Sequence, residues 1–337
     1  MDRTRAAVRV KTDSLGNVPP VLVSADSVHA QATPSREGSI FSTITPRAFA
    51  PHLDEPLPQR PAASAGKNGV CDLTFTVSRG TTRLSRSFVT HPFHLTSPWY
   101  LDSNLPNMAV VYLQTPAGGL IQGDRARMQF TLGPQSQVHL TTQAAEKIHS
   151  MTANCAVQQL SFTLGAGAYA EYCPEPIILF SGARFAQGIE VVLEPEASFF
   201  LSEIFLSRPA ADGATFDALS TRFQVREKAG GLLAHDQSFI QSQRQDLSGP
   251  GVLASCHAWG QAFLVGPTIP PSWIREIHEA ISISSNIFCG ATLLPKARGV
   301  CVKVVGANMP VIRQTLQSAW HYLRMRLLGV PAPVLPK

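Results

Sequence analysis

An internal repeat in the middle of this 337-residue sequence constrains its fold more than any other feature. Three copies, each with an alternating strand, a turn containing Gly or Pro and a second alternating strand, lie at residues 128–140, 160–172 and 189–201. The copies share a leucine before the turn, 32 and then 29 residues apart, at Leu132, Leu164 and Leu193. A period of ~20–50 residues indicates stacked supersecondary units, and stacking buries the apolar face that one unit cannot bury alone. The repeat therefore predicts a mainly β fold with a stacked, β-helical or solenoid-like antiparallel arrangement. The alternative is a β-sandwich with similar hairpins.

The repeat lies in a domain that we expect to span residues 67–337, behind an N-terminal extension of different composition. Residues 1–66 contain eight prolines and many Ser, Ala and Thr. No helical or strand period persists there, so we expect this extension to be disordered.

Two helices are expected near the C-terminus. The first follows Pro271 and carries isoleucines at helical spacing. The second runs from about Pro310 to Leu328, with Asn308 placed to cap its start and Gly329 placed to end it. Its apolar stripe predicts that this second helix packs against the sheet.

Composition and motifs exclude several classes of function. No run of residues approaches the ~18–20 apolar residues of a membrane-spanning helix, and the net charge of +5 comes without a nucleic-acid-binding motif. We therefore expect neither a membrane nor a nucleic acid as a partner. The six scattered cysteines lack C-x-x-C spacing and no secretory signal precedes them, which predicts reduced thiols and a cytoplasmic location. H-E-x-x-H and G-x-S-x-G motifs are absent, so we expect no enzymatic activity.

Four carboxylates are the candidate metal-contacting residues: Asp124, Glu171, Glu175 and Glu203. Asp124 closes the glycine-rich loop 118–124, where it either bonds local amides or faces a cavity and attracts a cation. Acids within apolar strands cost several kcal/mol unless they are paired or wet. Each of the others either pairs with a base, such as Lys147 or Arg184, or lines a water-filled passage with acidic walls.

The last part of the chain is basic. Residues 280–337 contain seven Lys and Arg and no Asp or Glu. This segment is either a solvated basic face or a docking surface for an acidic protein, and Arg313, Arg324 and Arg326 are the candidate partner-binding residues.

Several motifs, taken in order and with their spacing, resemble the UreD/UreH family of urease accessory proteins. The glycine loop contributes Gly118, Gly119 and Gly123, and is followed by a segment with Thr141, Thr142 and Lys147. A Pro-Glu-Pro segment containing Pro176 comes next, and then Glu203. The closing helix is also similar to that of the family.

The resemblance implies a β-helical, non-catalytic scaffold that matures urease. It implies binding to UreF-like and UreG-like accessory proteins and to apo-urease, and assistance in inserting nickel into the urease active site. It also implies that no cofactor is stably bound and that nickel passes in transit through an internal acidic passage. Asp124, Glu175 and Glu203 match family motifs and are expected to line that passage, while Glu171 is added from its place in the repeat.

Two other hypotheses remain open at the level of sequence. One is a carbohydrate-active β-solenoid hydrolase that uses Asp124 and Glu171 as paired carboxylates ~5–9 Å apart in an open groove. The other is a metal-free binding module that takes an acidic protein through residues 280–337.

Overall fold

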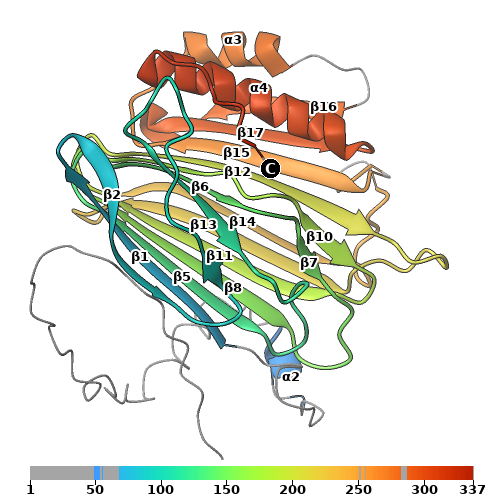
Figure 1. Cartoon of the computed structure of the whole chain (residues 1–337). Coiled ribbons are helices and arrows are strands. Elements are labelled where there is room, and N and C mark those ends of the chain that lie inside the picture. Colours follow the sequence, from blue (N-terminus) through green and yellow to red (C-terminus); the bar gives the residue numbers. More distant parts are fainter. Residues whose placement is uncertain are drawn as a thin grey trace, which may run out of the picture. The chain divides into compact units, whose positions relative to one another are not determined.

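Two β-sheets face each other in the computed structural model of this protein (Figure 1). The structure describes residues 49–53, 55, 68–249, 252–254, 256–281 and 287–336. Within them, sheet A has seven strands, in the order β14 (Leu232–Gln241), β13 (Ala218–Glu227), β11 (Arg184–Leu193), β8 (Ala156–Leu164), β5 (Arg125–Leu132), β1 (Asn68–Ser78) and β2 (Thr81–Val89).

Sheet B has ten strands in the same part of the chain. Its main path is β16 (Ile287–Leu293), β17 (Gly299–Gly306), β15 (Ala258–Val265), β12 (Ser198–Arg208), β9 (Tyr169–Tyr172), β6 (Gln137–Thr142), β4 (Ala109–Gln114) and β3 (His94–Leu95). Two short strands, β7 (Glu146–Ile148) and β10 (Ile177–Phe180), pair with each other, and β10 also pairs with β12.

The predicted repeat is confirmed as the unit of a β-solenoid. Each copy places its first strand in sheet A and its second strand in sheet B. The backbone register joins Leu132 to Leu164 and Leu164 to Leu193, as the sequence alignment of the copies predicts. The copies pair with one another in parallel, through β5, β8 and β11 in sheet A and β6, β9 and β12 in sheet B. Among the described strands, the expected antiparallel pairing occurs only toward the ends of the sheets, because equivalent strands of successive coils run in the same direction.

The turns between the two strands of each copy stack on one another. Gln135, Gly167 and Glu196 occupy the same place in successive turns, and all three have a left-handed φ, of 59°, 64° and 62°. The side chain of Gln135 fills the space beside the middle turn, because a Cβ on Gly167 would lie 2.1 Å from Nε2 of Gln135. Backbone hydrogen bonds also join each turn to the next, from Gln135 N–H to Ala166 O and from Gly167 N–H to Pro195 O.

Both expected C-terminal helices are present. They are α3 (Ser272–Ile281) and α4 (Met309–Leu328), and they pack over the outer face of sheet B (Figure 1). Gly329 ends α4 with a φ of 71°. Asn308 lies at the N-cap position of α4, but its side chain makes no capping hydrogen bond to the described residues, so this part of the prediction is wrong. A short 3₁₀ helix, η2 (Pro295–Ala297), precedes β17.

The apolar residues form separate clusters because each strand alternates between two faces. Between the sheets lie two inner clusters, one near the stacked turns, around Leu132 and Phe162, and one at the opposite ends of the strands, around Phe185 and Phe205. Another cluster joins the outer face of sheet B to α3 and α4. The last lies on the outer face of sheet A and includes Phe49.

Within the predicted N-terminal extension 1–66, the structure describes six residues, 49–53 and 55. Phe49, α2 (Ala50–Leu53) and Glu55 contact the domain. The rest of that predicted extension lies outside the described residues.

Candidate functional site

A layer of polar side chains crosses the space between the sheets. It takes one residue from each of five strands: Gln158 of β8, Gln187 of β11, Thr221 of β13, Glu203 of β12 and Gln261 of β15. All five are buried, and the residues two positions before and after each of them belong to, or pack against, the two inner apolar clusters. We call this set the polar layer; it separates the two inner clusters.

The backbone register fixes the order within the polar layer. Gln158, Gln187 and Thr221 lie side by side across sheet A, and Glu203 lies beside Gln261 in sheet B. The amide nitrogen of Gln187 donates to Oε1 of Gln158 at 3.2 Å, and that of Gln261 donates to Oε2 of Glu203 at 3.3 Å. The layer is therefore a row of oxygen and amide groups held by the register of two sheets.

Glu203 is the one ionisable member of the polar layer. Glu203 is 1% exposed. Among the described residues, its Oε1 has no hydrogen-bond partner, and neither of its carboxylate oxygens pairs with a Lys or Arg side chain. Burial raises the pKa of Glu203 to about 7, although hydrogen bonds from Gln261 and Gln187 oppose this rise. A buried carboxylate without a cation is costly, so this position has an unmet preference for positive charge.

The two ends of the polar layer differ. At one end, the backbone register places Lys303 of β17 beside Gln261, and the half-exposed Lys303 side chain pairs with Asp236 at 2.6 Å. At the other end, Gln158 lines a small cavity together with Asp124 and Glu146. This cavity has about 10 Å³, which is room for about one water molecule.

Asp124 has the local role that the sequence left open, and it also lines this cavity. Its Oδ2 accepts the Ile121 N–H at 3.0 Å and so closes the glycine loop. Gly119 lets the loop approach β7, because a Cβ there would lie 2.4 Å from the carbonyl oxygen of Lys147. Asp124 is buried, at 1% exposed, at the point where the loop enters β5.

Glu171 lies on the opposite face of sheet B from the polar layer. It belongs to a buried network in which its carboxylate accepts hydrogen bonds from Tyr169 at 2.7 Å and Trp320 at 3.0 Å and contacts His139 Nδ1 at 2.7 Å. Arg324 lies 3.4 Å away. Burial alone raises the pKa of Glu171, but the hydrogen bond and charge of His139, with the charge of Arg324, outweigh burial and hold the pKa below its ordinary value. Both oxygens of this carboxylate have hydrogen-bond partners, and its bond from Trp320 joins α4 to sheet B.

Arg324 itself is buried, at 1% exposed, and also pairs with Asp102. The expectation that Arg324 binds a partner stays a prediction, and this side chain is not accessible to a partner protein while α4 is in place. The physical reason is that Arg324 points from α4 toward Glu171 and Asp102, two acids from distant parts of the sequence.

The other candidate residues on α4 are more accessible and are also paired. Arg313 makes two hydrogen bonds to Glu175, at 3.1 and 2.7 Å, and Arg326 pairs with Glu276 of α3. The bases expected to pair with the carboxylates were Lys147 and Arg184, but Lys147 is exposed and Arg184 pairs with Asp217 and Glu55.

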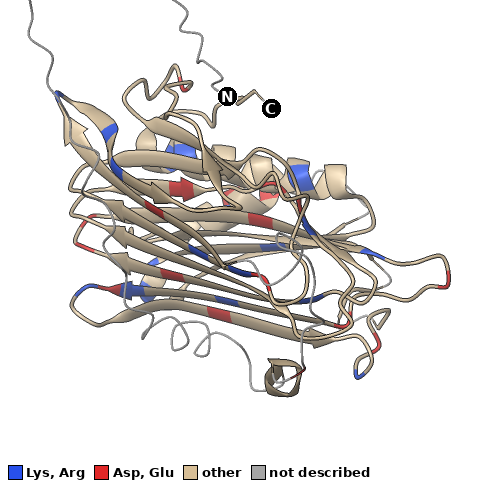
Figure 2. Ribbon diagram, turned by 60° about the horizontal axis from the view of Figure 1, so that its bottom comes forward, with Lys and Arg blue, Asp and Glu red and all other residues tan. Residues whose placement is uncertain are grey.

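The basic C-terminal segment is therefore largely neutralised within the chain. Five of its basic residues have acidic partners from earlier segments: Arg298, Lys303, Arg313, Arg324 and Arg326. Figure 2 shows acidic and basic positions interspersed over the strands and helices rather than gathered in a block of one sign. A uniformly basic docking face does not form from these residues.

The known proteins that this sequence matches decide its family. The family model described as "UreD urease accessory protein" matches residues 67–336. A urease accessory protein UreD of Haloarcula marismortui is 32% identical over 289 residues, which cover 85% of this chain and 96% of that protein. A UreD 2 protein of Streptomyces griseus is 33% identical over 279 residues, covering 81% and 95%. The chain belongs to the UreD family of urease accessory proteins. UreD family members are non-catalytic maturation factors that serve the assembly of the nickel metallocentre of urease.

Three of the motif segments that suggested the UreD family meet at one end of the solenoid: the glycine loop, the segment with Thr142 and Lys147, and the Pro-Glu-Pro segment. Leu120 N–H donates to Lys147 O at 2.7 Å, which joins the glycine loop to β7. Glu146 N–H donates to Pro176 O, and the Thr142 hydroxyl accepts the Glu175 N–H at 2.9 Å. These three segments are thus neighbouring connections between solenoid coils.

The structure does not bring together the paired carboxylates of the hydrolase hypothesis. Asp124 lines the small cavity between the sheets, whereas Glu171 is saturated on the side of sheet B that faces α4. Within the described ranges, no group of three or more His, Cys, Asp or Glu side chains is placed to hold a metal ion. No described helix combines the length and apolarity needed to cross a membrane.

Glu203 was a candidate from the sequence, whereas the other four residues of the polar layer were not. Glutamines within apolar strands were the available signal, since Gln158, Gln187 and Gln261 each interrupt an apolar face at the strand period. Asp102 was missed because nothing in a loop sequence shows that it meets Arg324 across 222 residues of chain.

Proposed function

We propose that this UreD family protein passes Ni²⁺ toward the urease active site along the polar layer, with Asp124 near one end and Glu203 in the middle. The observation that carries the proposal is Glu203, a buried carboxylate that no described Lys or Arg neutralises, in a row of side-chain oxygens between two apolar clusters. A cation that passes through a protein needs negative or dipolar groups to replace its lost hydration. Oxygen ligands also suit transfer of a borderline divalent ion better than thiolates, which favour retention.

The polar layer requires motion to conduct an ion. The cavity at Asp124 holds about one water molecule, so a hydrated ion enters only when the surrounding connections open. In this proposal nickel is cargo in transit and not a resident cofactor. Glu171 and Glu175 take no part as ligands, because strong donors already occupy both carboxylates.

We also propose UreF-like and UreG-like proteins and apo-urease as the partners, in the cytoplasm. Membership of the UreD family supports this assignment, and six cysteines that form no disulfide among the described residues suit a reducing compartment. On α4, the side chains of Arg313 and Arg326 are 30% and 46% exposed, although they pair with Glu175 and Glu276. A partner can therefore contact each of these two ion pairs from the surface.

Co-expression with urease and the other accessory proteins tests the proposal. The chain with Glu203→Gln is compared with the parent chain and with Glu196→Gln, which removes a carboxylate from an exposed turn. The expected result is low nickel per urease active site with Glu203→Gln and normal nickel with Glu196→Gln, at equal capture of the partners. Normal nickel with Glu203→Gln would remove this carboxylate from the route.

A further inference from the structure

Residues 49–53 and 55, which we call the strap, lie against the outer face of sheet A. The strap precedes residues 67–336, the part of the chain that the family model matches. It contacts β8, β11, β13 and β14 on the face that points away from the polar layer. The strap is thus a segment from outside the matched domain that is seated on that domain.

The first contact is an apolar cup that holds the Phe49 side chain. Phe49 is 1% exposed and packs with Cys155, Val157 and Ala186. The ring of Phe239 meets Phe49 edge to face, with 5.9 Å between the centroids. Cys155 is fully buried below, and burial raises the pKa of its thiol to about 11. The cup therefore fits one aromatic side chain.

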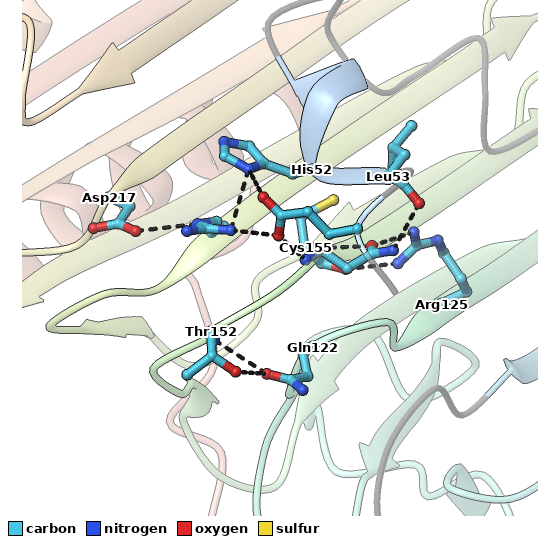
Figure 3. Close-up of polar contacts among 10 residues, drawn as sticks. His52, Leu53, Gln122, Arg125, Thr152, Cys155 and Asp217 are labelled. Carbon is cyan, nitrogen blue, oxygen red and sulfur yellow. Dashed lines mark hydrogen bonds and ion pairs between the residues drawn. The ribbon is translucent and has the colours of Figure 1, made fainter. Parts of the chain in front are cut away.

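The second contact is a carboxylate seat for Glu55. Its Oε2 accepts the Asn154 N–H at 2.8 Å and an N–H of Arg184 at 3.1 Å. The Nε–H of Arg184 donates to Oδ2 of Asp217 at 3.1 Å, and a dashed line from Asp217 marks this bond in Figure 3. A backbone N–H and a guanidinium that converge on one point form an anion-binding arrangement.

The seat is held in place by the domain. Arg125 donates to the carbonyl oxygens of Asp124 and Cys155 at 2.9 and 2.7 Å and to Oδ1 of Asn154 at 2.9 Å (Figure 3). This fixes Asn154 in a left-handed conformation, with φ 59°. Its side-chain amide then donates to the Leu53 carbonyl oxygen of the strap at 3.2 Å. The groups that contact the strap are thus oriented by hydrogen bonds that do not involve it.

The strap has little structure of its own. Its helix, α2, has four residues, which is far below the length that is stable alone in water. The Glu55 side chain is 33% exposed, so solvent and salt screen its pairing with Arg184. Such a contact is weak between separate molecules, but tethering raises the effective concentration of the segment.

We propose that the cup and the carboxylate seat form a peptide-recognition surface for a partner segment with an aromatic side chain followed six residues later by a carboxylate, and that the strap occupies this surface in cis. The strap itself shows the chemistry of the occupant, through Phe49 in the cup and Glu55 in the seat. The strap is then a built-in competitor that a partner segment displaces. This inference is independent of the nickel route, because it concerns the opposite face of sheet A.

The test uses the full chain and a fluorescent peptide of residues 46–57, followed by fluorescence anisotropy. The double variant Phe49→Ala with Glu55→Gln should release the strap and bind the peptide at least tenfold more tightly than the parent chain. A peptide carrying either of the same two substitutions should bind at least tenfold more weakly. The control variant Ala50→Ser changes an exposed strap residue and should behave as the parent. No binding to the released chain, or equal binding to the parent and released chains, would overturn the proposal.

Maleimide labelling, mapped by mass spectrometry, tests the same claim independently of the measured peptide affinity. Cys155 should react in the released chain and become protected again when peptide is added, while Cys71, buried in the inner cluster, stays protected and shows that the fold is intact. If Cys71 also reacts, the single variant Glu55→Gln replaces the double variant, with peptide binding at least threefold tighter than in the parent. Protection of Cys155 in an intact released chain would overturn the proposal.

Discussion

Replacing Glu203 by glutamine should stabilise the protein at pH 8 and not at pH 4. Glu203 is buried, and no described Lys or Arg pairs with it, so its ionised form is unfavourable in the folded chain. This expectation differs from both readings that the sequence allowed. A carboxylate paired with a base would lose stability on substitution, and a wet carboxylate would change little.

The magnitude follows from the two pKa values of this carboxyl. Burial raises the pKa of Glu203 from 4.5 to about 7 in the folded chain. The unfolded chain therefore releases this proton at lower pH, and the free energy of unfolding decreases as the pH rises from about 4.5 to 7. With ~1.4 kcal/mol for each pH unit between the two values, the loss is about 3 kcal/mol above pH 7. The glutamine avoids that loss but adds an N–H group without a partner, which costs ~1 kcal/mol at every pH.

Urea denaturation of the parent chain and of Glu203→Gln between pH 4 and pH 8 measures this difference. The variant should be ~1 kcal/mol less stable at pH 4 and ~2 kcal/mol more stable at pH 8, so the two curves cross. Glu196→Gln, at an exposed turn, serves as the control and should follow the parent at all pH values. Parallel curves for Glu203→Gln and the parent would refute the reasoning, because they would mean that Glu203 ionises alike in the folded and unfolded chains.

Three further changes probe other parts of the structure. Leu193 is 2% exposed and pairs in register with Leu164 of the preceding copy. Leu193→Ala should therefore lower the free energy of unfolding by ~2–5 kcal/mol in denaturant melts; a loss below ~1 kcal/mol would contradict the stacking of the repeat. Glu171→Gln should cost ~1–3 kcal/mol by the same measurement, because the glutamine cannot accept every hydrogen bond of the carboxylate and leaves the buried Arg324 with Asp102 as its acidic partner, and a neutral result would show that the network does not hold α4. Arg326→Glu should leave the unfolding midpoint nearly unchanged but slow the capture of a UreF-like partner at low salt. If the variant captures the partner as fast as the parent chain at both low and high salt, Arg326 lies outside the interface.

The solenoid could be predicted because its cause is local and periodic. The leucines of the repeat align in the sequence and also in the register of sheet A, since each must fill the same position beside a turn. The direction of pairing could not be predicted from the same pattern. An alternating strand buries the same side chains whether its neighbour is parallel or antiparallel, and only the path of the connections decides between them.

The candidate site was predicted less well because it depends on which face of a strand each residue occupies. Glu171 and Glu203 were treated as equivalent, but Glu171 pairs in register with Phe200. Glu203 is three positions beyond Phe200, so the two acids point to opposite faces of sheet B. The strap was missed for a different reason, because one phenylalanine and one glutamate six residues apart make no periodic pattern.

The most direct test of the nickel route removes the polarity of the polar layer without removing any charge. In the double variant Gln158→Met with Gln187→Met, both partners of one buried hydrogen bond become apolar groups of similar size, and Glu203 also loses its hydrogen bond from Gln187, so the expected loss of stability is ~1 kcal/mol. The chain is co-expressed with urease and the accessory proteins, and nickel is counted per urease active site. The account predicts a low nickel content with stability within ~1 kcal/mol of the parent and normal capture of partners. Full nickel occupancy with the same variant would contradict it, because the ion would then reach urease without the polar layer.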